Sequence, residues 1–210
     1  MRQMYNFATA IEALKKLERF RGQYYWKDYP ERKRYESVAE HSWRLGVLVM
    51  MFASQLKKKI NLEKALKMAL IHDLPEIIAG DASPLGKDGT GKMTHAFDEA
   101  ARLRKHEKEK RAAVALFGKL PTKIGAEFLK LWLEIEAHKT FEARVVKSLD
   151  KLECMLQVQE YRRGHLFSEH WHFTITYGMK GSEVDPVIAE FGSLIVKSMR
   201  KTFRPYHIKK

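Results

Sequence analysis

An apolar stretch that ends in a histidine–aspartate pair indicates both the fold class and the chemistry of this chain. It runs Leu62-Glu-Lys-Ala-Leu-Lys-Met-Ala-Leu-Ile-His-Asp73, and its apolar residues recur at the spacing of an amphipathic helix. Pro75 follows closely enough to end this helix or to begin the next one. The stretch therefore predicts a helix from Leu62 to about Leu74, with the pair His72-Asp73 at its end.

Two further polar residues in helical surroundings complete a pattern around this pair. His41 lies in Ser37-Val-Ala-Glu-His-Ser-Trp-Arg44, and Asp150 lies in Lys147-Ser-Leu-Asp-Lys151. Two imidazoles and two carboxylates form a donor set that suits a borderline or moderately hard divalent cation. Such an ion, with open positions, activates water and orients a phosphate. Taken alone, His41 would be a capped surface histidine and Asp150 a salt-bridge partner of a neighbouring lysine, but the joint pattern favours metal ligands.

This order of residues resembles the HD-domain metal-dependent phosphohydrolases. Three segments are similar to their 5′-deoxynucleotidase (YfbR-like) branch: Glu36-Ser-Val-Ala-Glu-His-Ser42, Ile71-His-Asp-Leu-Pro-Glu-Ile-Ile-Ala-Gly-Asp81 and Val146-Lys-Ser-Leu-Asp-Lys-Leu152. The resemblance runs from about residue 10 to about residue 162. It implies an all-α fold, a compact HD-domain helical bundle, whose metal ligands are His41, His72, Asp73 and Asp150.

Glu76 is the candidate catalytic residue. It lies four residues after His72 and three after Asp73, so the three share a helix face if the helix continues or is only kinked at Pro75. A carboxylate beside the metal can orient a water molecule or take its proton. The resemblance implies this role for Glu76, whereas a glutamate in the first turn of a helix is also favoured by the helix dipole alone.

The resemblance also implies three substrate-binding residues. Arg19 and Phe20 match an arginine–aromatic pair that holds the phosphate and sugar of a nucleotide, and a guanidinium can bond two phosphate oxygens at once. Asp81 opens a glycine-rich loop, and in the family an aspartate here binds the deoxyribose. This sequence has a longer segment between Arg19 and His41 than the shorter relatives, so Arg21 remains a rival for Arg19.

Apolar spacing predicts helices along most of the chain, without a convincing alternating strand pattern. We expect a first helix from about Phe7 that ends near Arg19-Phe-Arg-Gly22. Further helices are expected at about Val38–Lys57 (opened by a capping box at Ser37), Leu62–Leu74, Thr94–Phe117, Ile124–Ile135, Thr140–Leu156 and Glu183–Met199. The segments Gln23–Glu36 and Gly80–Thr94 are expected to be loops, and Arg163–Gly181 an irregular aromatic region. We expect a single HD phosphohydrolase domain over residues 1–210, with its motif core at about 37–155.

Composition limits the class of protein and its partners. Of the 210 residues, 45% are hydrophobic, which allows one sizeable core, and no apolar run is long enough to span a bilayer. Cys154 is the only cysteine, so no intrachain disulfide can form, and we expect a cytoplasmic protein. The net charge of +13 favours anionic partners, although no nucleic-acid-binding motif accompanies it. His165, His170 and His172 lie close in sequence, and packing or surface roles are favoured over a second metal site.

The pattern and the resemblance together predict a metal-dependent phosphomonoesterase that converts (deoxy)nucleoside 5′-monophosphates to nucleoside and phosphate. In the family the divalent ion can be manganese, cobalt or magnesium, and homodimers are common. We expect no membrane partner and no nucleic-acid partner. Two alternatives stay open: hydrolysis of another nucleotide by an HD domain (triphosphate, cyclic nucleotide or alarmone), and a basic nucleic-acid-binding module with a vestigial metal site.

Overall fold

The computed structural model describes residues 1–20, 35–86, 88–162, 165–166 and 168–205. The predicted all-α class is confirmed, with two strands of two residues each that pair in parallel. The elements are α1 (Arg2–Ala10), η1 (Ile11–Lys15), α3 (Val38–Ala53), α4 (Leu62–Ile71), α5 (Glu76–Ala79), α6 (Glu99–Phe117), α7 (Thr122–Ala137), α8 (Phe141–Arg162), β1 (His165–Leu166), α9 (Ser168–Gly178), η2 (Ser182–Val184), α10 (Pro186–Thr202) and β2 (Arg204–Pro205). The predicted loop Gln23–Glu36 lies mostly outside the described residues.

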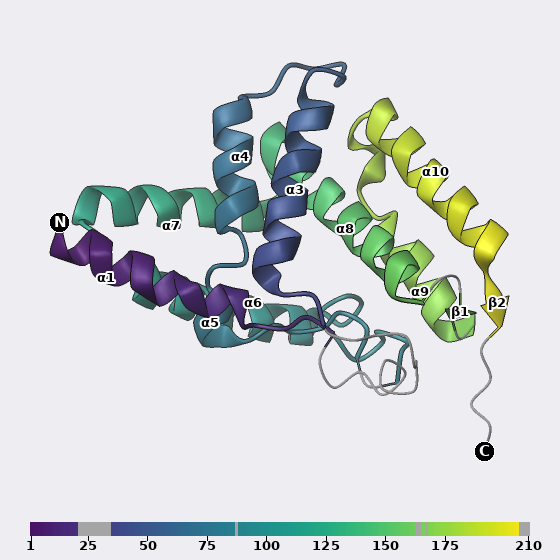
Figure 1. Ribbon diagram of the computed structural model, residues 1–210, viewed down its shortest axis with the longest axis horizontal. Helices are drawn as coiled ribbons and strands as arrows, with labels where there is room; N and C mark the ends of the chain where they lie inside the picture. Colours follow the sequence, from purple (N-terminus) through teal and green to yellow (C-terminus); the bar gives the residue numbers. More distant parts are fainter. Residues whose placement is uncertain (21–34, 87, 163–164, 167, 206–210) are drawn as a thin grey trace.

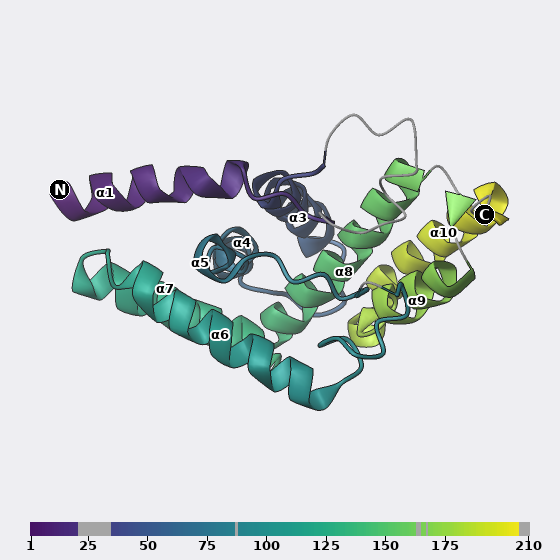
Figure 2. The same cartoon turned by 90° about the horizontal axis from the view of Figure 1, so that it is seen from below.

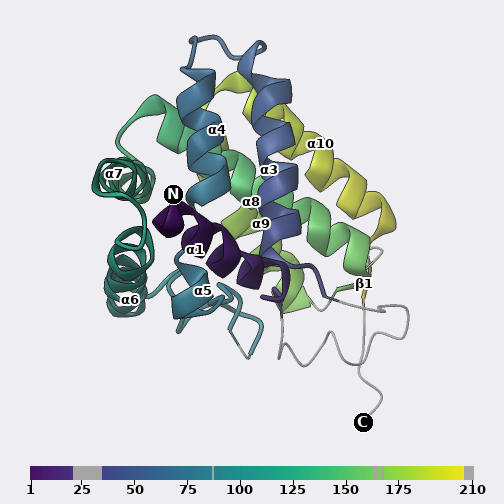
Figure 3. The same cartoon turned by 60° about the vertical axis from the view of Figure 1, so that its left-hand side comes forward.

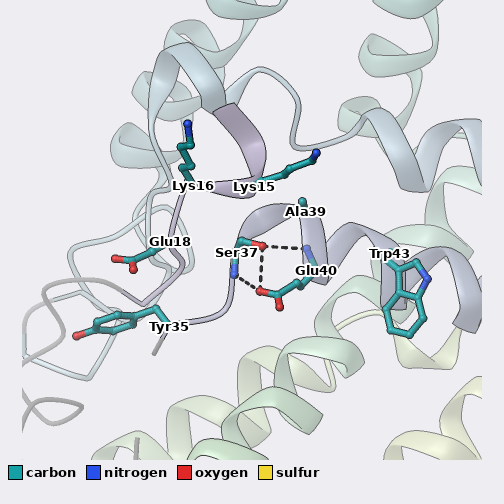
Figure 4. A pocket seen from close by; sticks show the side chains of 8 residues that line it. All are labelled: Lys15, Lys16, Glu18, Tyr35, Ser37, Ala39, Glu40 and Trp43. Carbon is teal, nitrogen blue, oxygen red and sulfur yellow. Dashed lines mark hydrogen bonds between the residues drawn. The ribbon is translucent and has the colours of Figure 1, made fainter. Parts of the chain in front are cut away.

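The capping box predicted before the second helix is present. The Ser37 hydroxyl accepts a hydrogen bond from the Glu40 N–H, and the Glu40 carboxylate accepts one from the Ser37 N–H (Figure 4). The cap begins α3 one turn before His41, whose side chain is fully buried. A well-defined helix start therefore places this histidine in the interior.

Helix α4 ends at Ile71, three residues before the predicted end. Pro75 has no N–H to bond to the carbonyl of Ile71, so the chain turns there instead of continuing the helix. Hydrogen bonds from the Leu74 N–H to the Ile71 carbonyl and from the Glu76 N–H to the Asp73 carbonyl close this turn. Pro75 then precedes α5, so the His72-Asp73 pair lies in a tight turn between two helices.

The helix predicted from Thr94 begins later, at Glu99. The Thr94 hydroxyl instead donates to the carbonyls of Pro84 and Gly91, at 2.5 and 2.8 Å, which closes the glycine-rich loop on itself. Asp98 caps α6 by accepting a hydrogen bond from the Ala101 N–H.

Helix α8 runs through the middle of the molecule. It contacts α3, α4 and α7, and α9 and α10 pack against it on the side away from α6 and α7 (Figures 1 and 2). Helices α6 and α7 lie beside α5 and α4 (Figure 3). One hydrophobic core joins these helices, and its largest fully buried side chains include Trp132, Phe117, Leu45, Met68 and Leu149.

The expectation of an irregular region from Arg163 to Gly181 is wrong, because α9 spans Ser168–Gly178. This segment is rich in aromatic and β-branched residues, which have weak helix propensity. Close packing on α8 stabilises it: a Cβ added at Gly178 would lie 2.3 Å from the sulfur atom of Met155. Tertiary contact thus decides a segment that local propensity leaves open.

The two ends of the chain also differ from prediction in detail. The first helix changes to a 3₁₀ helix at Ile11, and the last one begins at Pro186, where Asp185 accepts a hydrogen bond from the Val187 N–H. Within the described residues, no helix is both long and apolar enough to cross a membrane.

Candidate metal centre

The four predicted metal ligands converge from three parts of the chain. His41 Nε2 lies 3.0 Å from Asp150 Oδ1 and 3.7 Å from Asp73 Oδ2. His72 Nε2 lies 3.0 Å from Asp73 Oδ2 and 3.9 Å from Asp150 Oδ1. The first turn of α3, the turn after α4 and the middle of α8 therefore bring two imidazole nitrogens and two carboxylates to one point.

This arrangement fits a divalent cation. The Nε2 atoms of His41 and His72 are buried, and neither has a hydrogen-bond partner among the described residues, although carboxylate oxygens lie nearby. Buried polar atoms are rarely left in this state, and one cation between the rings and carboxylates would satisfy both nitrogens. Asp150 is also held in its charged form, because Lys147 and both histidines outweigh the effect of burial and keep its pKa well below the usual range.

Glu153 orients the ring of His41. Its fully buried carboxylate contacts Nδ1 of His41 and accepts a hydrogen bond from Arg44 Nε at 2.6 Å. A carboxylate on one ring nitrogen leaves the other free to face a metal ion and increases its basicity. Sequence analysis did not identify Glu153, although it lies three residues after Asp150 on the same helix face.

Helix α7 holds the turn that carries His72. The Trp132 indole N–H donates to the backbone carbonyl of His72 at 3.0 Å, and Nδ1 of His72 lies 2.9 Å from the carbonyl oxygen of Ala69. These buried contacts hold Nδ1 and the backbone carbonyl of His72. Its Nε2 atom, on the other side of the ring, therefore faces the other predicted ligands.

His41, through Nδ1, forms a second group of possible ligands with Glu153 and Cys154. Arginine side chains already contact the other two members of this group. Arg19 donates to the sulfur atom of Cys154 at 3.0 Å, and Arg44 donates to Glu153. Burial raises the pKa of the Cys154 thiol above its usual range, which disfavours the thiolate. The Nε2 side of His41 is therefore the better metal site.

Glu76 lies beside the ligands, although α4 does not continue to it. It is the first residue of α5, its side chain is buried, and Oε2 has no hydrogen-bond partner among the described residues. Burial, together with the negative charges of Asp73 and Asp81, raises the pKa of Glu76 well above its usual range. The turn at Pro75 thus brings about the proximity to Asp73 that helical spacing had predicted.

The structure also brings together the three predicted substrate-binding residues. The Asp81 carboxylate accepts a hydrogen bond from the Phe20 backbone N–H, and the charge of Arg19 acts on it. Arg19 is buried and pairs with Glu36, Nη1 to Oε2, at 3.1 Å. Its guanidinium is therefore part of an internal ion-pair network beside Glu153. Arg21 lies outside the described residues.

Two cavities border residues of the candidate site. One has a volume of about 60 Å³ and mostly apolar walls, and it reaches Arg19 and Phe20. The other has a volume of about 710 Å³ and reaches Asp150. Residues of α6, α7, α8 and α9 and of the loop before α6 line it, and basic side chains outnumber acidic ones among them. Lys151 lines both cavities, and burial together with the charge of Lys147 lowers its pKa to about 8.

Other candidate places are less suited to the predicted chemistry. His170 is buried on α9 and His172 is exposed, so they do not share a face; the side chain of His165 lies outside the described residues. A surface hollow of about 490 Å³ at the start of α3 is lined by Lys15, Tyr35 and Trp43 among others (Figure 4). None of the predicted site residues lines this hollow.

Comparison with known proteins identifies the family. The model of the HD domain family matches residues 11–191, so the chain belongs to this family. The 5′-deoxynucleotidases HDDC2 of Xenopus laevis and Danio rerio are 35% and 34% identical to it over 133 residues, 63% of this chain. The match spans 59% of the length of each relative. A predicted metal-dependent phosphohydrolase from Magnetospirillum magnetotacticum is similar over 97% of both chains, with a TM-score of 0.71 and 25% identity.

Proposed function

We propose that this chain is a metal-dependent phosphomonoesterase that hydrolyses deoxynucleoside 5′-monophosphates to nucleoside and phosphate. The observation that carries the proposal is the convergence of His41, His72, Asp73 and Asp150, with two buried imidazole nitrogens that lack any other partner among the described residues. The names of the two HDDC2 relatives support the choice of substrate.

The four ligands suit manganese, cobalt or magnesium, since mixed nitrogen and carboxylate donors accept several divalent ions. When bound, such an ion supplies Lewis-acid polarisation of the phosphate and of the attacking water. Glu153 keeps the His41 ring in place through Nδ1. Asp73 and Asp150 supply the negative charge that holds a cation in a buried site.

Glu76 is the residue that moves the proton. Its Oε2 atom is buried near Asp73 and has no hydrogen-bond partner among the described residues, so it can accept a proton from a water molecule beside the ligands. Asp81 and Phe20 lie next to each other and near Arg19, where the sugar and phosphate of a nucleotide are expected to bind. The cavity beside Phe20 has mostly apolar walls.

We further propose a homodimer, supported by exposed apolar side chains on α3 and α4, among them Trp43 at 68%, Met51 at 59% and Leu70 at 54% exposure. The sequence-based expectations of a cytoplasmic location and of a single domain stay predictions.

A phosphate-release screen tests the proposed function. Metal-stripped protein is assayed with deoxynucleoside and ribonucleoside 5′-monophosphates, deoxynucleoside triphosphates and cyclic nucleotides, with and without each divalent ion. We expect phosphate release from deoxynucleoside monophosphates only when a divalent ion is added. Release from triphosphates or cyclic nucleotides alone would assign the site to another HD-type reaction, and salt-sensitive nucleic-acid binding without hydrolysis would reject the enzyme proposal.

A further inference from the structure

The larger cavity beside the metal centre is cationic. Asp150 is one of its lining residues, so the cavity reaches one of the four predicted metal ligands. Among the described residues of its wall, the basic side chains are Arg102, Lys105, Lys147, Lys151 and Lys180, and the acidic ones are Glu109, Glu136 and Asp150. With more cations than carboxylates, the cavity attracts an anionic ligand toward the metal ligands.

Most of the cations deep in this wall already have a carboxylate partner. Lys105 contacts the Glu109 carboxylate. Lys147 Nζ lies 3.6 Å from Glu136 Oε1 and 3.5 Å from Asp150 Oδ2. The charges of these lysines are therefore balanced within the protein, and neither needs a ligand to offset it.

Lys151 differs from Lys105 and Lys147 in its contacts. Among the described residues, no carboxylate lies within ion-pair distance of its ammonium group. Nζ donates one hydrogen bond, to the backbone carbonyl of Lys180 at 3.0 Å, and lies 5.4 Å from the centre of the Tyr177 ring. That ring is stacked on Phe173, with 5.3 Å between centroids, so it offers a fixed platform for the ammonium. A half-buried ammonium with one neutral acceptor is ready to bind an anion.

The position of Lys151 on α8 determines which anion its ammonium group can bind. It follows Asp150 directly on α8, only about 1.5 Å along the helix axis and about 100° around it. Its side chain lines both the cationic cavity and the apolar cavity that contains Arg19 and Phe20. Lys151 therefore lies between the cavity that reaches Asp150 and the cavity that reaches Arg19 and Phe20.

We infer that Lys151 is a phosphate-binding residue, whose ammonium group binds a non-bridging oxygen of the substrate phosphate beside the metal centre. This inference rests on the proposed function only in that the substrate is a phosphate monoester. A lysine ammonium is a compact point charge that suits this task. Its charge also stabilises the negative charge that is spread over the phosphate oxygens during hydrolysis.

Orthophosphate binding to the metal-loaded protein, measured by titration calorimetry, tests the inference. The test variant is Lys151→Gln, because an amide can still donate to the Lys180 carbonyl but carries no charge. We expect the dissociation constant for orthophosphate to rise about 10-fold, the loss typical of one hydrogen bond to a charged group. Lys151→Arg, which keeps the charge, should bind orthophosphate more tightly than the glutamine variant.

Lys67→Met is the matched control, since it removes one lysine charge on α4 outside the cavity. It should bind orthophosphate as the wild type does. Metal content and thermal unfolding of every variant are measured in parallel, and Lys151→Met provides a second neutral variant if the first does not fold. A purely structural role would lower stability and leave the dissociation constant unchanged.

Three results would overturn the inference: no detectable orthophosphate binding by the metal-loaded wild type, equal binding by Lys151→Gln and wild type, or an equal loss in Lys67→Met. Orthophosphate is the product of any phosphomonoesterase, so the choice of nucleotide does not affect this test. Binding that depends on Lys151 without hydrolysis of deoxynucleotides would reject the proposed function and keep the phosphate site. Hydrolysis of deoxynucleotides by the wild type, with unchanged orthophosphate binding in Lys151→Gln, would keep the proposed function and reject the phosphate site at Lys151.

Discussion

At the scale of single residues, Glu153 orients the imidazole of His41, which is one of the proposed metal ligands. Its carboxylate contacts Nδ1 of His41, and Arg44 holds it from the other side. The ring can then turn only its Nε2 atom toward Asp73 and Asp150. The geometry of one ligand thus depends on a fixed charge network behind it.

Replacement of Glu153 should weaken metal binding at the proposed site. We expect Glu153→Gln to reduce metal affinity about 10- to 100-fold, because the amide orients and polarises the ring less well than the carboxylate. Glu160→Gln is the control, since Glu160 also pairs with Arg44, at 2.6 Å, but its side chain is 52% exposed and no contact to His41 is formed. Competition with a metal indicator dye measures both affinities, and equal values for the two variants would contradict the role of Glu153.

The second prediction at this scale concerns Glu76. Glu76→Gln should retain the metal ion, because Glu76 is not among the four ligands, but turnover should fall by about 10²–10⁴-fold if it moves the proton. Stopped assays of phosphate release, together with metal analysis of the same samples, measure the two effects separately. Turnover near that of the wild type would remove Glu76 from the mechanism.

The third residue-scale prediction concerns pH. Burial, with the positive charges of Lys105 and Lys147, lowers the pKa of His95 from 6.5 to about 4. Between these values the unfolded chain binds a proton at His95 that the folded chain does not, so the free energy of unfolding falls as pH drops through this window. His95→Gln removes this contribution, on the order of 2 kcal/mol after allowance for partial solvent access. Urea denaturation at about pH 7 and about pH 4.5 should therefore show a smaller pH dependence for the variant than for wild type, and equal dependence would contradict this.

At the scale of elements, the glycine-rich loop between α5 and α6 packs tightly onto α9. A Cβ at Gly91 would lie 2.2 Å from the Phe173 ring, and one at Gly89 would lie 1.8 Å from the His170 ring. The Thr94 hydroxyl closes the same loop. Because Asp81 begins this loop, its packing on α9 contributes to the position of the predicted sugar-binding residue.

Gly91→Ala and Gly80→Ala separate packing from backbone strain. Both glycines have positive φ, +70° and +78°, but an added Cβ at Gly80 meets nothing within 4 Å. We expect Gly80→Ala to cost about 1–2 kcal/mol of stability from backbone strain alone. Gly91→Ala should cost about 1–3 kcal/mol more, because the added methyl group also displaces Phe173. Equal losses in urea denaturation would show that the loop does not press on α9.

Elements also show where sequence reasoning reaches its limit. Local rules predicted the start of α3 at Ser37, because a capping box depends on residues next to each other. They failed for α9, whose aromatic segment is helical because it packs on α8 and the loop. They also placed the start of α6 too early, at Thr94. The Thr94 hydroxyl, which would cap a helix there, closes the loop instead.

At the scale of the whole molecule, the residues of the site come from segments far apart in sequence. The convergence of the four proposed ligands could be predicted, since their order and helical surroundings are visible in the chain and match a family pattern. The support from Glu153 and the surroundings of the half-buried Lys151 ammonium could not, because they depend on how α3, α9 and the residues after α9 pack around α8. The cationic cavity likewise exists only when α6, α7, α8 and α9 are assembled.

The most direct test of the central claim is metal content and phosphate release measured on the same samples of wild type and Asp73→Ala. The four-ligand site predicts that the variant loses bound metal and phosphatase activity together, because Asp73 Oδ2 lies between the two histidines. Asp88→Ala, a change of an aspartate in the glycine-rich loop that accepts hydrogen bonds from nearby Thr90, should retain both properties. Full phosphatase activity in metal-stripped Asp73→Ala protein would contradict the account.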